Sequence, residues 1–321
     1  MFKEKIFGKY LSIFLFLFLA ISLLSLSLGH ENYALNQLFS SEIVRNIRIP
    51  RLIAGVCLAV LLSTSGLLMQ NLTQNPIADM STLGVSSGAS LALSLALNLS
   101  VSSNPWTLIV YGSLGAGLAF FIVFILTLKD KFDPLKVILV GTSVGLFSSS
   151  LASAISYYKK NSQQYFLWIV GSFSGINKQK MLELLIVSIF VVLMVFIFAK
   201  QIKILGFGSE LATGLGVNVS LTRFIIMILV VLAAGVSVST VGMFSFVGLI
   251  GPHMARRLIG SSSFVRVFIL SNIMTIDLVI LADFLSRYLF RPYEFPVGSL
   301  LMLLGAPFFL YLVARSKEIR S

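Results

Sequence analysis

Long apolar runs separated by short polar stretches follow one another along the whole chain. Many of these runs contain about 20 residues, enough for a helix to cross roughly 30 Å of hydrocarbon. The pattern predicts about ten membrane-spanning helices, near residues 10–28, 51–70, 81–99, 106–128, 135–156, 181–199, 221–241, 246–259, 267–287 and 297–314. The runs do not alternate as the strands of a membrane β-barrel do. We therefore expect an all-α, polytopic fold.

One stretch between two of these runs does not fit a membrane span. The segment GSELATGLGVNVS at 208–220 is too polar for the bilayer because it contains Glu210, Asn218 and several glycines. It is also too apolar for a plain loop, because three residues would form an apolar face on a short helix: Leu211, Leu215 and Val217. The pattern predicts a short amphipathic helix outside the membrane.

Composition supports a membrane domain. Of 321 residues, 57% are hydrophobic and only 11% are charged, which is too apolar for a soluble domain of this length. The gaps between the runs leave no room for a soluble domain, so we expect one transmembrane domain over 1–321. The basic, apolar N-terminus lacks a convincing cleavage site, and we interpret it as the first membrane helix. The single cysteine, Cys57, excludes a disulfide framework.

The formal net charge of +12 comes from basic residues at the ends of apolar runs. With both termini in the cytoplasm, most of the 24 basic residues lie on the cytoplasmic side, as the positive-inside rule expects. No basic patch is interleaved with aromatic residues, so we expect a lipid bilayer and no nucleic acid as the partner.

The sequence contains almost none of the motifs of catalysis. It lacks the lysine-bearing phosphate loop of an ATPase and the HExxH metal motif, and it has only two histidines. We expect no enzyme activity, no cofactor and no metal site. His253 is more readily explained by packing than by ligation. Asp277 lies within an apolar run without an evident partner, whereas Asp283 and Arg287 have the i,i+4 spacing of a pair on one helix face.

Five arginines fall on the predicted outer side in two tight groups, Arg45, Arg48 and Arg51 in RNIRIPR and Arg287 and Arg291 near the end of the ninth span. One interpretation is that these arginines are interfacial anchors whose charged ends reach water. Positive charge is normally sparse on that side, however, and the guanidinium group pairs well with carboxylates. An acidic partner that docks from outside is the sharper interpretation.

Several spans end in segments broken by glycine and proline, among them NLTQNPIADMSTLGVSSGAS and VGMFSFVGLIGPHMARR. Irregular backbone at membrane depth is tolerated where protein or a water-filled cavity satisfies its polar groups. The breaks therefore indicate a pathway, and close helix packing through small residues is the alternative.

Together, RIPRLIAGVCLAVLLSTSGLLMQNLTQNPIAD, ELATGLGVNVSLTRF, GLIGPHMARRLIG, LADFLSR and FPVGSLLMLLGAP resemble the FecCD family from residue 45 to 314. These proteins are permease subunits of type II importers of the ATP-binding cassette class, which carry iron–siderophore complexes, haem or cobalamin. The resemblance implies a cobalamin-permease-like fold of ten membrane helices in a bacterial cell membrane. It also implies a second permease subunit, two ATPase subunits and an extracytoplasmic binding protein as partners.

The resemblance also assigns roles to particular residues. It implies that segment 208–220 is the coupling helix on which the ATPase acts, through Glu210, Leu211, Ala212, Gly214, Leu215, Gly216 and Val217. It implies that the binding protein docks on Arg48, Arg51 and Arg287. It places the cytoplasmic gate at Asn75, Pro76 and Ile77. Asp277 departs from the family pattern, in which a small or apolar residue is usual.

The main hypothesis is an ATP-driven permease for a ferric siderophore. Haem or cobalamin is the alternative cargo, and an ion-coupled secondary transporter that works alone is the alternative class. Whether the two permease subunits are identical stays open.

Overall fold

The computed structural model describes residues 2–316 apart from 30, 39, 82, 100–103, 129–133, 261–262 and 290–292, and this part of the chain contains helices and no strand. Ten helices correspond to the ten expected spans: α1 (Phe2–Ser27), α2 (Ile49–Thr73), α3 (Val85–Asn98), α4 (Pro105–Leu128), α5 (Pro134–Tyr158), α7 (Lys178–Ile197), α10 (Val219–Val241), α11 (Val247–Ile259), α12 (Phe264–Tyr288) and α13 (Val297–Ser316). Three shorter helices complete the set: α6 (Ser162–Val170), α8 (Ala199–Leu205) and α9 (Ser209–Gly214). A 3-10 turn at Leu35–Gln37 and a π turn at Val44–Arg48 precede α2.

Seven helices in the described part are long and apolar enough to cross a membrane. The predicted polytopic, all-helical fold is thus confirmed, but the count of ten spans is not. The three that fall short include α3, with 14 residues, and α11, with 13. At 1.5 Å per residue these two helices extend only about 20 Å. Each of them follows an irregular connection, which takes up part of the apolar run. The described apolar part of α13, Val297–Phe308, is also shorter than a full span.

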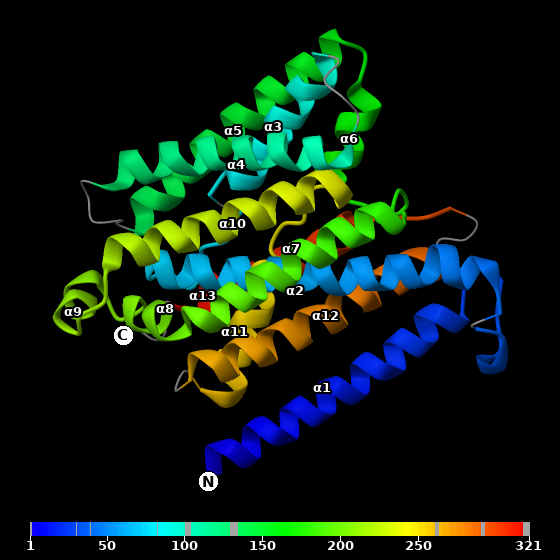
Figure 1. The fold of residues 1–321 in the computed structure, drawn as a ribbon, viewed down its shortest axis with the longest axis horizontal. Helices are drawn as coiled ribbons and strands as arrows, with labels where there is room; N and C mark the ends of the chain where they lie inside the picture. Colours follow the sequence, from blue (N-terminus) through cyan, green and yellow to red (C-terminus); the bar gives the residue numbers. More distant parts are fainter. Residues whose placement is uncertain are drawn as a thin grey trace.

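Helix α2 lies at the centre of the bundle, with α7, α10, α11 and α12 packed around it. Figure 1 shows α3, α4 and α5 on one side of α10, and α1 as an outer helix next to α12. Two polar contacts define the register of α1: Arg266 pairs with Glu4, and Arg287 bonds to Ser25. Both contacts join residues 262 positions apart, so α1 and α12 run parallel.

Small residues bring some helices very close together. A Cβ atom on Gly66 of α2 would collide with the carbonyl group of Gly248 in α11, and one on Gly88 of α3 would collide with the backbone of Gly115 in α4. These contacts account for part of the glycine content by packing alone. Large apolar side chains point outward instead on the outer helices, for example Phe16, Leu118 and Phe147. Such a surface suits a lipid environment.

The candidate residues lie at the two ends of the bundle. Figure 1 shows α9 at one end, towards which the N-terminal end of α1 also lies. The beginning of α2 and the connection between α12 and α13 lie at the opposite end. Arg48 and Arg51, at the beginning of α2, and the predicted coupling segment are therefore at opposite ends of the bundle.

Candidate functional site

Arg51, in the first turn of α2, is the centre of a buried ionic cluster. Its Nε donates to Oδ1 of Asp283 over 2.8 Å, and its Nη1 donates to Oε2 of Glu294 over 2.9 Å. Asp283 also pairs with Arg287 over 3.0 Å, which confirms the predicted i,i+4 pair on α12. Arg287 donates further to the hydroxyl of Ser25 in α1 over 2.8 Å. Four segments are joined in this way at one end of the bundle.

Arg48 is buried as well, with 6% of its surface exposed. Its guanidinium group donates to the carbonyl oxygens of Leu26 and Glu31 over 2.6 and 2.5 Å and lies over the ring of Tyr33. A side chain at Gly29 would collide with it. Arg48 therefore fastens the end of α1 and the following loop to the π turn before α2.

Of the three arginines expected to dock a binding protein, Arg48 and Arg51 thus lie inside the molecule and already have partners. The cluster is accessible from outside through Glu294, whose side chain is 43% exposed. Arg45 is exposed on the same π turn, and Arg291 lies outside the described residues. Docking itself stays a prediction. Sequence reasoning missed Glu294, because nothing local relates it to Arg51.

The predicted short helix between two spans is present as α9, and its ends follow known capping rules. Glu210 lies in its first turn, where the helix dipole favours a negative charge. At the other end Gly216 has a φ of 77°, its N–H bonds to Thr213, and the N–H of Val217 bonds to Ala212. This is a Schellman motif, which needs a residue that tolerates a left-handed conformation. Gly216 therefore makes the tight turn, whereas Gly214 is the last helical residue and touches nothing that excludes a side chain.

The helix presents an apolar surface to its surroundings. Leu211 and Leu215 are 62% and 66% exposed, and Phe207, just before the helix, is 62% exposed. Ala212 is buried. Val217 is half-buried and, with Leu215, lines a hollow of about 250 Å³ between α8 and α10. The predicted apolar face consequently consists of Leu211 and Leu215 with Phe207, a residue that the sequence reasoning did not include.

The predicted gate residues lie in the irregular connection between α2 and α3. Gln74 ends α2 in a left-handed conformation with a φ of 53°. Asn75 is buried, and its side-chain oxygen accepts the N–H of Ile77 over 3.1 Å. Pro76 is exposed and Ile77 is half-buried. The side chain of Asn75 thus holds a tight turn at this point.

Asp79, in the same connection, was missed by the sequence reasoning. It is 1% exposed, and its carboxylate accepts the N–H of Met80 and the hydroxyl of Ser81. It also accepts the backbone N–H of Phe246, at the start of α11.

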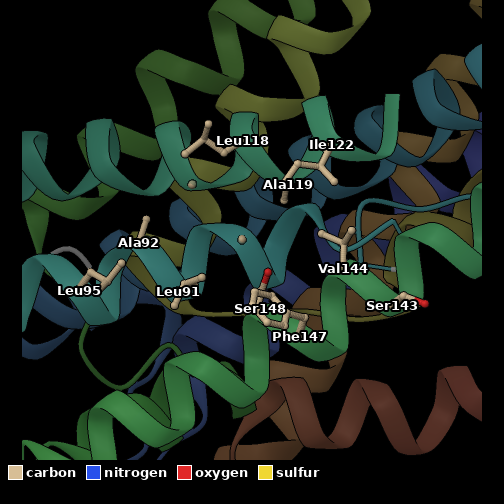
Figure 2. Close-up of a pocket in the computed structure, with 12 residues that line it drawn as sticks. Leu91, Ala92, Leu95, Leu118, Ala119, Ile122, Ser143, Val144, Phe147 and Ser148 are labelled. Atoms are coloured by element: carbon tan, nitrogen blue, oxygen red, sulfur yellow. The ribbon is translucent and has the colours of Figure 1, made fainter. Parts of the chain in front are cut away.

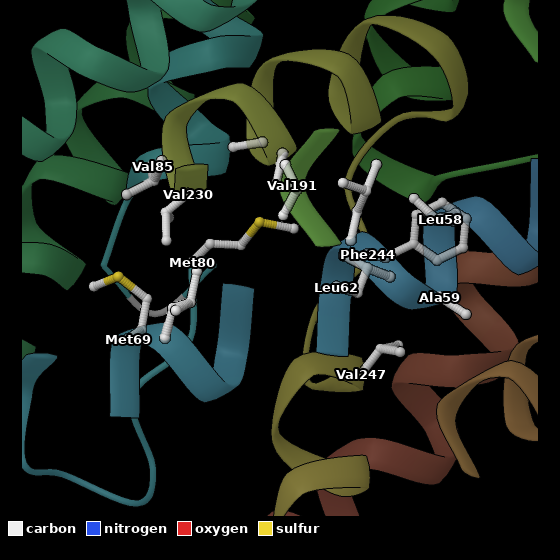
Figure 3. Close-up of a cluster of buried hydrophobic side chains, with 14 of the residues drawn as sticks. Leu58, Ala59, Leu62, Met69, Met80, Val85, Val191, Val230, Phe244 and Val247 are labelled. Atoms are coloured by element: carbon white, nitrogen blue, oxygen red, sulfur yellow. The ribbon is translucent and has the colours of Figure 1, made fainter. Parts of the chain in front are cut away.

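The carboxylate of Asp79 therefore joins two irregular connections, the one after α2 and the one after α10. Figure 3 shows Met80 and Phe244, one from each connection, among buried side chains of α2, α7 and α10. The predicted gate is continuous with the core of the bundle.

Asp277 and His253, two other candidates from the sequence, make few polar contacts with the described residues. Asp277 is 5% exposed on α12, and neither carboxylate oxygen has a partner within the described part of the chain. His253 is half-buried with its ring edge-on to Phe308 at 6.0 Å between ring centres. Among the described residues no group of three or more metal-ligating side chains occurs.

An apolar cavity of about 470 Å³ lies between α3, α4 and α5. Figure 2 shows the side chains that line it, among them Leu91, Leu95, Leu118, Ile122, Val144 and Phe147. Among the described residues that line it, the polar side chains are those of Ser143 and Ser148. None of these described lining residues is charged.

Two solved structures have a similar fold. A metal-chelate type transporter of the ATP-binding cassette class, solved in an inward-facing conformation, matches with a TM-score of 0.83 and covers 96% of this chain and 99% of its own. The sequence identity is 24%, so this match concerns the fold alone. The PsaBC complex of Streptococcus pneumoniae matches with a TM-score of 0.64 and 18% identity.

Sequence comparison goes further. The Fe(3+)-citrate import system permease protein YfmD of Bacillus subtilis is 32% identical over 87% of this chain and 83% of its own length. The Fe(3+) dicitrate transport system permease protein FecC of Escherichia coli is 33% identical over 85% and 83%. The hemin transport system permease protein HmuU of Yersinia pestis is 31% identical over 95% and 96%. The model of the FecCD transport family matches residues 14–315. The chain therefore belongs to the FecCD transport family.

Proposed function

We propose that the chain is the membrane-spanning permease subunit of an ATP-binding cassette importer that moves a ferric siderophore from its binding protein into the cytoplasm. The observation that carries this proposal is the family match over residues 14–315, together with relatives that import ferric citrate. The chain supplies the pathway, and a separate ATPase subunit hydrolyses ATP. Our proposal needs no cofactor and no metal ligand in the chain itself.

The proposed assembly contains two permease subunits, two ATPases and one extracytoplasmic binding protein. This chain is a single domain over 1–321 that crosses the membrane ten times, with both termini in the cytoplasm, and the second permease subunit is another copy or a related protein. In this arrangement α3 and α11 complete their crossings through the irregular connections that precede them. The concentration of Lys200, Lys203, Arg256 and Arg257 near the α9 end supports a cytoplasmic location for that end.

In this proposal segment 208–220 is the coupling helix. Leu211 and Leu215 would enter an apolar groove on the ATPase, and Glu210, Ala212, Gly214, Gly216 and Val217 would shape and orient the helix. Support comes from the exposure of both leucines on a helix outside the spans. An exposed apolar surface on a helix that is not in lipid is typical of a protein interface.

The proposed gate lies at Asn75, Pro76 and Ile77, where the chain changes direction between α2 and α3. The proposed docking surface for the binding protein lies at the opposite end, around Arg48, Arg51 and Arg287. Because these arginines are held internally, acidic groups of the binding protein would approach Arg51 through the position of Glu294.

Haem is a second candidate cargo, because the relative that covers 95% of this chain is named for hemin transport. Cobalamin remains a third. The test is ATP-dependent uptake by vesicles that contain the permease, its ATPase and its binding protein, with labelled ferric citrate, a ferric hydroxamate, haem and cobalamin supplied separately. Uptake of a ferric chelate but not of haem or cobalamin supports the proposal. Preferential uptake of haem or cobalamin would show that this compound, and not a ferric siderophore, is the cargo. Uptake by the permease alone, driven by an ion gradient, would refute an ATP-binding cassette importer.

A further inference from the structure

A small pocket with a basic and an apolar half lies at the α9 end of the bundle. It has a volume of about 190 Å³ between the end of α2, α8, α11 and the start of α12. Its polar side chains are Asn71, Lys203 and Arg256. Its apolar walls come from Leu67, Phe207, Phe264 and Val267. None of the described residues that line it carries a carboxylate.

The polar half of the pocket is rich in hydrogen-bond donors. Arg256 donates to the side-chain oxygen of Gln70, while the side-chain nitrogen of the same Gln70 is buried without a partner among the described residues. Lys203 is exposed, and no ion pair joins it or Arg256 to a carboxylate within the described part. The side-chain nitrogen of Asn71 donates to Leu67, and its oxygen packs against Gly206. The two cations that line the pocket therefore have no carboxylate partner among the described residues.

The apolar half belongs to membrane-spanning helices. Leu67 lies in the span Val44–Thr73, and Phe264 and Val267 lie in the first turn of the span Phe264–Tyr288. The pocket is consequently at the level where the spans end and basic residues begin. Its occupant has to satisfy cations on one side and hydrocarbon on the other, which is the chemistry of an amphiphile with a negative head group.

We propose that this pocket binds an anionic phospholipid of the adjacent leaflet, with its phosphate between Lys203 and Arg256 and its glycerol and first acyl carbons against Leu67, Phe264 and Val267. Basic pockets between spanning helices on the cytoplasmic side suit such head groups. Phe207 forms one wall and directly precedes Gly208, the N-cap of α9. The lipid would therefore connect the base of α9 to α2, α11 and α12.

The site can be tested on the purified full chain in a neutral detergent, independently of cargo or coupling. Native mass spectrometry would measure the binding of dioleoyl phosphatidylglycerol and of dioleoyl phosphatidylcholine. We expect one tightly retained phosphatidylglycerol per chain. The change Lys203→Gln should weaken this binding about fivefold, and Lys203→Gln with Arg256→Gln more than tenfold.

The matched control is Lys200→Gln with Arg257→Gln, which removes two exposed cations at the same end that do not line the pocket. It should retain the tightly bound phosphatidylglycerol. Equal loss in the control and the test variant would overturn the proposal in favour of diffuse surface charge. If removal of Arg256 prevents folding because its bond to Gln70 is lost, Lys203→Gln alone still decides, since its side chain is exposed.

Two further measurements distinguish the lipid from other possible occupants of the pocket, a free phosphate and an acidic group of the ATPase. Inorganic phosphate and glycerol 3-phosphate should not displace the lipid at concentrations equal to it; displacement by either would assign the pocket to a free phosphate and overturn the lipid. The purified ATPase subunit should bind the Lys203→Gln variant in lipid-free detergent as well as it binds the original chain. Loss of that binding, without selective retention of phosphatidylglycerol, would assign the pocket to an acidic group of the ATPase.

Discussion

The Nε atom of Arg51 donates a 2.8 Å hydrogen bond to Asp283, a residue 232 positions further along the chain. Both side chains are buried, with 6% and 7% of their surfaces exposed. The pair joins the beginning of α2 to the end of α12 and, through Glu294 and Arg287, holds the connection before α13 and the end of α1. This end of the bundle is therefore held together by charge in the interior.

Replacing Arg51 should destabilise the protein. The change Arg51→Met leaves Asp283 with Arg287 alone and removes the partner of Glu294. Breaking a buried ion pair typically costs about 3–5 kcal/mol, and we expect the lower end because Arg287 remains. Thermal unfolding in detergent measures the loss. The exposed Arg45, changed to Met, is the matched control and should alter the stability by less than about 0.5 kcal/mol. Equal unfolding temperatures for the two variants would contradict a structural role for the buried pair.

The binding protein should compete with Glu294 for Arg51. The pair between Glu294 and Arg51 is partly exposed, so it contributes about 1 kcal/mol or less and can be exchanged. The change Glu294→Gln removes the competing charge, and association of the binding protein at low salt should become about two- to threefold faster. Stopped-flow mixing with the reconstituted permease measures the rate. Glu42→Gln, at an exposed acidic residue just before the π turn, is the control. If neither Glu294→Gln nor added salt changes the rate, Arg51 does not receive an acidic partner.

Changes on α9 should uncouple the permease from its ATPase without unfolding it. Leu211 and Leu215 are exposed, so Leu211→Asp or Leu215→Asp should leave the unfolding temperature nearly unchanged. Burial of one leucine in an interface contributes about 1.5–3 kcal/mol, and each variant should bind the ATPase at least tenfold more weakly. Co-purification and stimulated ATP hydrolysis measure the effect. Tyr158→Asp, at an exposed aromatic residue that ends α5, is the control and should bind normally. Normal ATPase binding by both leucine variants would exclude this helix as the joint.

Much of this organisation follows from local patterns in the sequence. The positions of the helices, the short helix at 209–214 and the pair of Asp283 with Arg287 all depend on residues close together in the chain. By contrast, Arg51 meets Asp283, and Asp79 meets Phe246, only after distant helices have packed. A sequence pattern also cannot distinguish an arginine at a surface from one whose partners arrive from another helix. For this reason the outer arginines were expected to be open to a partner, whereas Arg48 and Arg51 are buried.

The predicted gate can be tested by thiol labelling. Asn75 is buried on a tight turn, so Asn75→Cys in a Cys57→Ser background should react slowly when the gate is closed. Labelling from the cytoplasmic side should change at least severalfold between the nucleotide-free and ATP-bound complexes. Gln74→Cys, at the exposed preceding residue, should react at a similar rate in both states. A constant rate at position 75 in every nucleotide state would count against a gate at this point.

Asp79 should determine whether that gate stays closed. Its carboxylate accepts hydrogen bonds from Met80, Ser81 and Phe246, and an asparagine offers only one acceptor oxygen in the same space. Asp79→Asn therefore leaves at least one buried donor without an acceptor, which costs about 1–3 kcal/mol. Because Phe246 is the N-cap of α11, the connection after α2 also loses its hydrogen bond to the start of that helix.

We expect Asp79→Asn to lower the unfolding temperature and to make Asn75→Cys reactive even in the closed state. Ser81→Ala, which removes one of the three bonds and leaves both carboxylate oxygens as acceptors, is the control and should have a clearly smaller effect on both measurements. Combined unfolding and labelling separates the two effects. Labelling of buried Cys57 is measured in a second Asp79→Asn chain that keeps Cys57 and Asn75, and a merely destabilised bundle would label faster there as well as at position 75. If labelling at both positions rises together, Asp79 supports the core in general; if only position 75 responds, the bond from Phe246 to Asp79 closes the gate.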